Sequence, residues 1–167
     1  MTTLTKAQAD LELTLLEAEA DSMTSTDLFV WLHNIGLSPE IAGKLHDLID
    51  KTKKIGERVI PIGKIILLKI IEFAKENPHL AIGAAVGAVV AVLLNEIPFL
   101  GALLAPIALA LGLLAGYRLD KKEKGEDVAS YLNIAAIAED IIVIAKKFLD
   151  LLVEVFNVMF NDEQVGQ

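Results

Sequence analysis

The sequence predicts an all-α protein with an integral membrane helical hairpin, flanked by long amphipathic helices and a small N-terminal helical region. Three observations lead to this fold class. From residue 77 to residue 117 the chain carries one formal charge, Glu96. On both sides of this stretch, polar residues recur at helical spacing along one side only. Hydrophobic residues make up 54% of the chain and aromatic residues only 5%, a bias toward small and aliphatic side chains that is common where lipid is the solvent.

Length and charge narrow the class further. A chain of 167 residues fits one domain, or a small domain with a membrane element. The net charge of −8 argues against a nucleic-acid partner, because neutralising phosphates requires clustered Lys and Arg. The absence of cysteine excludes disulfides and thiolate chemistry. The acidic, polar start does not match a secretory signal, so we expect the chain to begin in the cytoplasm, or to leave it by a route that the sequence does not show.

The first predicted element is an acidic N-terminal helix in residues 1–23. Four apolar residues recur at helical spacing on one side of this helix, and its acidic residues lie elsewhere around it. The four are Leu4, Leu11, Leu15 and Ala18. This is the pattern of a short amphipathic helix, with these four residues on its apolar side.

A small helix–turn–helix region is predicted in residues 24–56. Residues 24–26 offer N-caps for a helix that Gly36 can end in the left-handed conformation. Ser38 caps the next helix, and Pro39 stands at its first position. The run "WLHNIGL" and the short helix after it resemble the opening of a SAM-type interaction domain.

Two long amphipathic helices are predicted around the uncharged stretch. In residues 57–76 the charged side chains share one side of the helix, which suits a position at the membrane interface or against a partner helix. Residues 118–167 are predicted to form a C-terminal amphipathic helix and tail, with polar positions recurring between residues 139 and 161. The apolar arc of this second helix is roughly twice as wide as its polar arc, so it must bury two sides.

Residues 77–117 are predicted to form a transmembrane helical hairpin. The two uncharged runs, 77–95 and 97–117, each approach the ~20 apolar residues that span ~30 Å of hydrocarbon. Asn95, Glu96 and Pro98 supply the turn between the arms. Basic residues precede and follow the hairpin but are missing from its turn. The positive-inside rule therefore places both termini in the cytoplasm and the protein in the inner, cytoplasmic membrane.

Close helix packing is predicted at the glycines of two G-x-x-x-G motifs, Gly83 with Gly87 and Gly112 with Gly116. This spacing lets helix backbones approach in a lipid bilayer, either within the hairpin or between protomers, and we expect a homo-oligomer. A second arrangement fits the same residues. In it, the hairpin is a buried central helix pair of a soluble bundle that hides the hairpin until triggered.

No catalytic, cofactor or metal site is predicted, and we do not expect an enzyme. His33, His46 and His79 lie far apart in the sequence, and none has the spacing of a zinc ligand set. No phosphate-binding loop or nucleophile motif is present. Glu96 either gates insertion by protonation, forms a charged ring in an oligomer, or is a simple polar turn residue.

The layout of an apolar hairpin between amphipathic helices resembles that of α-helical pore-forming proteins such as colicin-type channel domains. The sequence therefore predicts a homo-oligomeric membrane protein that forms a pore or permeabilises a membrane, as a toxin, defence effector or channel. Water in such a pore would face the polar stripes of the two long helices, with candidate lining residues Lys64, Lys69, Asp140, Asp150 and Glu154. The alternative is a membrane-anchored scaffold or adaptor that recruits a protein partner through residues 24–54.

Overall fold

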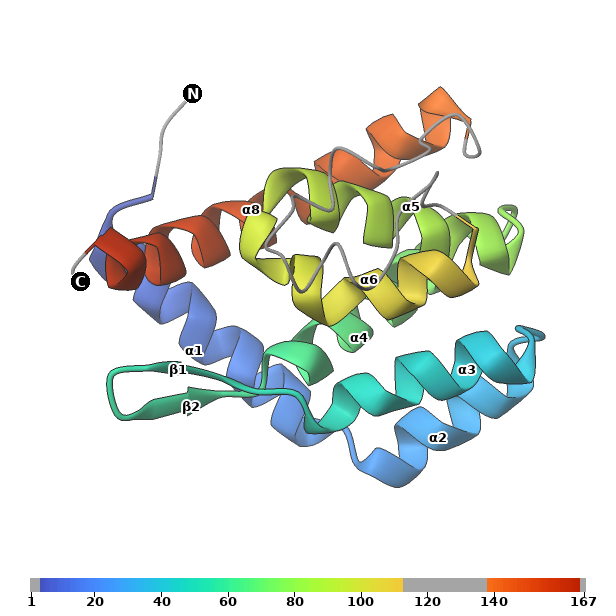
Figure 1. The fold of residues 1–167 in the computed structure, drawn as a ribbon, viewed down its shortest axis with the longest axis horizontal. Helices are drawn as coiled ribbons and strands as arrows, with labels where there is room; N and C mark the ends of the chain where they lie inside the picture. Colours follow the sequence, from blue (N-terminus) through green and yellow to red (C-terminus); the bar gives the residue numbers. More distant parts are fainter. Residues whose placement is uncertain (1–3, 113–137, 166–167) are drawn as a thin grey trace.

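The computed structural model describes residues 4–112 and 138–165, which are almost entirely helical (Figure 1). In the N-terminal half the elements are α1 (Lys6–Ser22), α2 (Ser25–Asn34), α3 (Pro39–His46), the 3₁₀ turn η1 (Asp47–Asp50), β1 (Lys53–Ile55) and β2 (Arg58–Ile60). They are followed by α4 (Ile62–Glu76), α5 (Ile82–Glu96), the 3₁₀ turn η2 (Pro98–Leu100), α6 (Gly101–Ala110) and α8 (Glu139–Val165). The all-α prediction is confirmed, with one short β-hairpin added.

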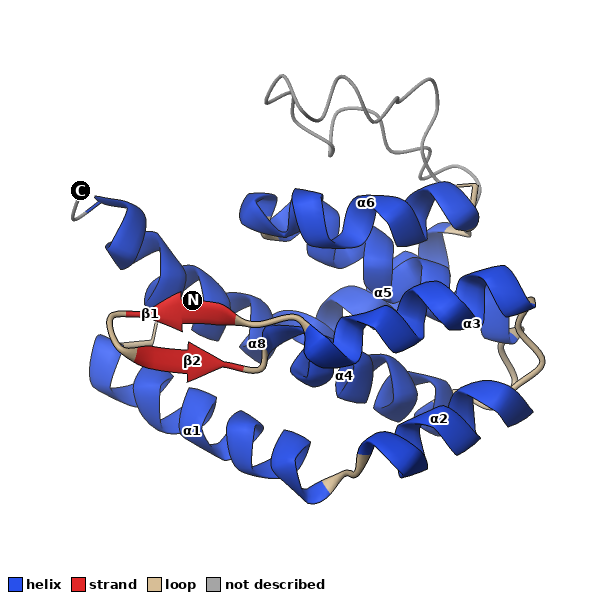
Figure 2. Cartoon of the chain, turned by 60° about the horizontal axis from the view of Figure 1, so that its bottom comes forward, coloured by secondary structure: helices blue, strands red, loops and turns tan. Residues whose placement is uncertain are grey.

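The helices form a bundle with α4 and α5 at its centre. The long helix α8 lies against α5 and α1, and so buries two sides as its wide apolar arc predicted. Helix α6 runs back along α5 and also contacts α3, while α2 and α3 pair at one end of the molecule (Figures 1 and 2). The hairpin of β1 and β2 lies beside α1 (Figure 2).

The core of this bundle is wholly apolar. Every residue from 85 to 94 in α5 is buried, and α4 buries most of its aliphatic residues around it. Within the two described ranges, no polar or charged residue is buried. Of the two arms of the predicted hairpin, α5 lies in this core and α6 is partly exposed, so the two arms are not both buried as the second expected arrangement required.

The predicted helix starts in the N-terminal region are confirmed. Thr24 caps α2 in a capping box with Asp27. The Ser38 hydroxyl accepts from the Ile41 N–H at the start of α3, with Pro39 at the first helical position. Gly36 has φ +87°, the left-handed conformation that glycine adopts without steric cost.

The helix predicted over residues 57–76 begins later, at Ile62. Pro61 disfavours the helical conformation for the residue before it, so the chain enters α4 only after the proline. The preceding residues pair instead as an antiparallel hairpin, with Ile55 opposite Arg58. Its two-residue turn begins at Gly56, whose φ of +60° meets the requirement of a type II′ turn for glycine at this position.

The predicted apolar side of α1 is not the side that packs. Leu11 and Leu15 are 62% and 51% exposed, and Ala18 is exposed as well. The buried residues lie on the other side of the helix: Ala9, Leu13, Leu16 and Ala20. Helix α1 therefore has two apolar sides, and only the second one meets α8 and α4.

The helices of the predicted hairpin are shorter than the uncharged runs of the sequence. Helix α5 has 15 residues and α6 has 10. Within residues 4–112 and 138–165, none of the helices combines the length with the unbroken apolar character that crossing a bilayer takes. Residues 113–117 of the second arm lie outside the described residues.

Candidate functional site

The candidate site is the apolar hairpin formed by α5, η2 and α6. The two helices lie side by side and run in opposite directions (Figure 1). At the turn, Asn95 is exposed and Glu96 is half-buried, while Pro98 begins η2. Asn95 and Glu96 are thus the last two residues of α5, and of the three predicted turn residues only Pro98 lies between the two helices.

Polar contacts hold the turn against α8. The side-chain amide of Asn157 donates a hydrogen bond to the backbone carbonyl of Glu96 at 3.2 Å. The Glu96 carboxylate accepts from the Asn95 amide at 3.3 Å and lies 3.7 Å from the Lys146 ammonium. Because these groups are partly exposed, each contact contributes little to stability. Glu96 nevertheless has partners within the chain, which its place in the sequence did not indicate.

An aromatic cluster with one cation adjoins the same turn. The rings of Phe99 and Phe160 have their centroids 5.1 Å apart, and Phe156 meets Phe160 edge-on at 5.4 Å. The Lys53 ammonium of β1 lies 5.1 Å from the centroid of Phe99 and 5.8 Å from that of Phe160, within range of a cation–π interaction. The turn is therefore in contact with both α8 and the β-hairpin.

Helix α6 has no polar or charged side chain, even on its outward side. Ala102 and Leu109 are exposed, and Leu103, Pro106 and Ala110 are half-buried. Two shallow clefts of about 150 and 260 Å³ separate this side from charged residues of α3, with Lys44 and Pro106 lining both. A helix at the surface of a water-facing bundle ordinarily carries a polar stripe, and α6 lacks one.

The four predicted packing glycines lie in different surroundings. Gly87 is buried within α5, whereas Gly83 is exposed, and a Cβ built on it meets nothing within 4 Å. Gly112 follows the end of α6 with φ +76°, and Gly116 lies outside the described residues. Gly83 therefore does not bring two helices of this chain together, and packing between protomers stays a prediction.

The candidate pore-lining residues lie on α4 and α8. Lys64 and Lys69 are half-buried on α4, and the Lys69 ammonium lies 3.1 Å from Glu72 and 5.8 Å from the Phe148 ring centroid. On α8, Asp140 and Asp150 are exposed and Glu154 is half-buried. In the part of the chain that the structure describes, no ion pair joins the lysines to these acids.

Within residues 24–54, α2 and α3 form a separate cleft. It has a volume of about 320 Å³ and is lined in part by Phe29, which is 53% exposed. His33 stacks on this ring with centroids 5.8 Å apart, and His46 meets its edge at 5.7 Å. These histidines come together although they are distant in the sequence. Among the described residues, however, no group of three or more potential metal ligands is found.

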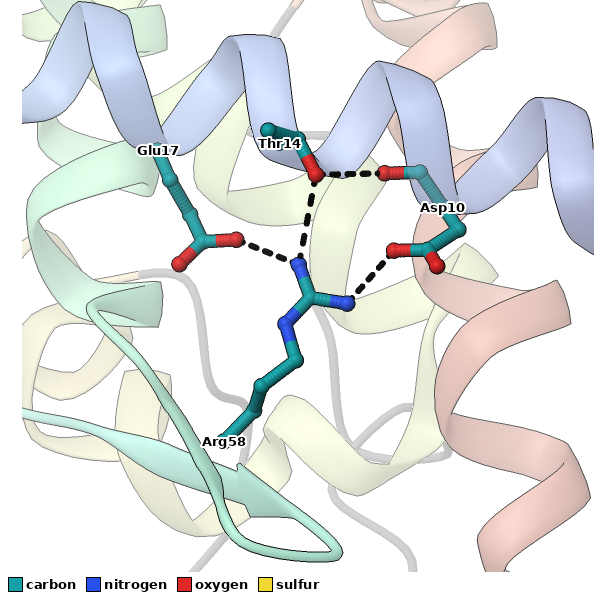
Figure 3. Close-up of polar contacts among 4 residues, drawn as sticks. All are labelled: Asp10, Thr14, Glu17 and Arg58. Carbon is teal, nitrogen blue, oxygen red and sulfur yellow. Dashed lines mark hydrogen bonds and ion pairs between the residues drawn. The ribbon is translucent and has the colours of Figure 1, made fainter.

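One ionic cluster was missed by sequence reasoning (Figure 3). The Arg58 guanidinium of β2 donates to Asp10 at 2.5 Å, to Glu17 at 2.6 Å and to the Thr14 hydroxyl at 3.5 Å, all on α1. The hydrogen bonds from Arg58 to Asp10 and then to Glu17 raise the pKa of Arg58. No local pattern indicates such a long-range cluster.

Comparisons of the chain with protein-family models, with curated proteins and with solved structures find no match.

Proposed function

We propose that the chain permeabilises a membrane as a homo-oligomer, after the hairpin of α5 and α6 leaves the bundle and enters the bilayer. The observation that carries this proposal is the outward side of α6. A surface helix that stays in water typically carries a polar stripe, and α6 has no polar side chain at all. The apolar outward side of α6 is matched to lipid instead.

Insertion requires the two helices to lengthen. The uncharged runs of 19 and 21 residues are long enough for ~30 Å of hydrocarbon, whereas α5 has 15 residues and α6 has 10. Basic residues before and after the hairpin then stay on one side of the membrane, the cytoplasmic side under the positive-inside rule.

The energetic balance supports this movement. The polar contacts that hold Glu96 to α8 are partly exposed and therefore weak. The main loss on leaving the bundle is apolar burial of α5. Contact with lipid compensates for this lost burial, because acyl chains are about as apolar as Leu side chains. The apolar residues of α5 and the wholly apolar α6 thus give up little when the solvent becomes a bilayer.

A second candidate function is a membrane-anchored adaptor that recruits a protein partner through residues 24–54. The exposed ring of Phe29 in the cleft between α2 and α3 favours it, since aromatic side chains in such places are common in protein interfaces. The hairpin then serves as an anchor only, and no conductance is expected.

A cross-linking experiment tests the first function. The chain has no native cysteine, so Glu96→Cys with Asn157→Cys introduces a single possible disulfide between the hairpin turn and α8. Dye release from phosphatidylglycerol vesicles is measured for the oxidised and the reduced variant. We expect no release while the bridge is closed and full release after reduction. A short bismaleimide joins the same two cysteines if the disulfide does not close.

Each single cysteine variant serves as a control, because oxidation cannot tie its hairpin to α8 within one chain. Release by the bridged variant at the parent rate would show that the hairpin stays in the bundle during permeabilisation. A parent chain that binds vesicles but releases no dye would remove the pore and leave the adaptor.

A further inference from the structure

Helix α1 has an apolar side that covers nothing in the bundle. Its opposite side packs on α8 and α4, yet Leu11 and Leu15 stand one turn apart with exposed fractions of 62% and 51%. Leu11 is the most exposed large hydrophobic residue in the described part of the chain. One exposed leucine is ordinary, but two at i and i+4 form a continuous stripe.

The stripe follows a heptad. Leu4, Leu11 and Ala18 are seven residues apart, and Leu15 lies four residues after Leu11. If the first three occupy d positions, Leu15 occupies an a position, which is the seam of a coiled coil. Leu4 at the start is half-buried, so the free part of the seam is centred on Leu11 and Leu15.

Acidic residues border this seam. In the same heptad, Glu12 and Glu19 occupy e positions and Asp21 a g position, the places where charges select the partner of a coiled coil. Within residues 4–112 and 138–165, none of these three carboxylates makes an ion pair. The remaining acids of the helix, Asp10 and Glu17, form ion pairs with Arg58 (Figure 3).

We propose that this side of α1 binds a basic amphipathic helix of a partner protein. The partner would present aliphatic residues to Leu11 and Leu15 and place Lys or Arg opposite Glu12 and Glu19. A second copy of α1 fits less well, because its own acidic border would face Glu12 and Glu19. A lipid surface fits less well too, since interfacial helices carry basic polar sides and anionic headgroups repel carboxylates. The inference does not depend on the hairpin or on permeabilisation.

Two synthetic helices test the proposal against the full-length chain. Both are three-heptad peptides with Leu at a and d, and they differ by carrying Lys or Glu at e and g. Fluorescence anisotropy measures their binding. We expect the Lys peptide to bind and the Glu peptide not to. Leu11→Ser with Leu15→Ser should weaken binding of the Lys peptide by about 100-fold, because two leucine contacts are lost.

A charge reversal gives the sharper result. Glu12→Lys with Glu19→Lys should exchange the preference, so that the Glu peptide binds and the Lys peptide does not. The matched control is Val143→Ser with Leu151→Ser, which removes two similarly exposed apolar side chains from α8. This control should leave binding unchanged. Circular dichroism and urea unfolding of every variant verify that the fold is retained.

Several outcomes would overturn the proposal. One is binding of the Lys peptide that the serine changes at Leu11 and Leu15 leave intact. Another is a parent dimer that the same changes convert to a monomer, which would make the occupant a second copy. A third is binding of phosphatidylglycerol vesicles that is lost with these changes, which would make the occupant lipid.

Discussion

The guanidinium of Arg58 on β2 lies 2.6 Å from the carboxylate of Glu17 on α1, although 41 residues separate them in the sequence. Asp10, two turns earlier on α1, binds the other nitrogen of the same guanidinium. These contacts form only when one flank of α1 faces the β-hairpin. Because α1 has apolar residues on two sides, Arg58 favours the orientation that buries Leu13 and Leu16 and leaves Leu11 and Leu15 outside.

Replacing Arg58 with Gln should lower the free energy of unfolding by about 1 kcal/mol. Two nitrogens of its guanidinium each bind a carboxylate, but these ion pairs are partly exposed. The side-chain exposures are 38% for Arg58 and 23% for Glu17. The pKa of Arg58 is raised, first by its hydrogen bond to Asp10, so the stabilisation from the charged guanidinium is present at neutral pH and is lost on the alkaline side only as the pH rises through that pKa. Salt, in contrast, should reduce it. Urea unfolding at low and high salt measures both effects.

The control for Arg58 is Lys54→Gln on β1, an exposed base for which the structure shows no ion pair in the described residues. An equal loss of stability in both variants would mean that net charge, and not the cluster on α1, causes the effect.

Gly63 should tolerate no side chain. A Cβ at this position of α4 would lie 1.9 Å from the carbonyl oxygen of Leu48 and 2.9 Å from Cβ of Lys51. The Gly63 N–H also donates to the Lys51 carbonyl at 3.1 Å, so η1 and α4 approach backbone to backbone. We expect Gly63→Ala to cost about 3 kcal/mol or to prevent folding, since backbone atoms would have to move.

Gly43→Ala is the matched change for Gly63, because a Cβ there meets nothing within 4 Å. It should raise the stability by roughly 0.5–1 kcal/mol, the usual gain for Ala over Gly inside a helix. Thermal unfolding of both variants compares them directly. Similar melting temperatures for the two would contradict the close approach of η1 to α4.

The sequence predicted the parts of the fold that depend on local chemistry. Capping by Thr24 and Ser38 involves residues within one turn, so the helix starts could be read directly. The β-hairpin was missed although a local signal existed. β-Branched residues flank Gly56, and Pro61 ends the pairing, which together are typical of a hairpin and not of a helix.

The orientation of α1 and the contacts of the hairpin turn could not be predicted. Both sides of α1 carry apolar residues at helical spacing, so periodicity alone does not choose between them. The partners of Glu96 come from α8, 50 or more residues away, and depend on how the helices pack. The apolar helices α5 and α6 could be predicted, because the composition of residues 77–117 alone indicates them.

A charge on the outward side of α6 should block insertion without unfolding the bundle. Leu109 is 36% exposed, so Leu109→Arg can keep its guanidinium in water in the bundle. In the centre of a membrane helix the same charge costs about 2.5–3.5 kcal/mol on the insertion scale. We expect normal urea unfolding and reduced fractionation with membranes. Unchanged fractionation would contradict insertion of α6.

Val90→Arg makes a useful contrast to Leu109→Arg. Val90 is fully buried in α5, so an arginine there should destabilise the bundle itself through an unpaired buried charge. Loss of membrane binding in this variant alone is therefore not proof of spanning. Only the surface change at Leu109 separates insertion from folding.

Among the predicted packing glycines, Gly83 gives the cleanest test of assembly. It is exposed and has open space around it, so Gly83→Leu should not disturb the bundle. If the G-x-x-x-G of α5 packs between protomers in the membrane, the leucine holds the backbones apart and the oligomer mass in detergent falls. Leu103→Ile, which keeps the volume on α6, should leave the mass unchanged. An unaltered mass for Gly83→Leu would exclude this glycine from the interface.

Ion selectivity separates a pore from an anchor. Lys64 on α4 and Asp150 on α8 are suitable positions, because neither makes an ion pair in the described residues and neither is buried. If α4 lines a water-filled path, its lysines favour anions, and Lys64→Glu shifts the reversal potential toward cation selectivity in a bilayer recording. If α8 lines the path, Asp150 and Glu154 favour cations, and Asp150→Lys shifts the potential the other way. Lys69 is less suitable, because its pairing with Glu72 and Phe148 changes the bundle as well.

An anchor makes the opposite prediction for the same recordings. The parent chain would bind membranes and conduct nothing under any trigger, and neither charge reversal would change its behaviour. Removing residues 24–54 would then abolish function while the hairpin remains membrane-bound. We favour the pore, because α4 and α8 bury wide apolar surfaces around α5 and an anchoring hairpin alone has no need of two such helices. A membrane-bound but electrically silent parent would reverse that preference, since ion selectivity requires a conducting state.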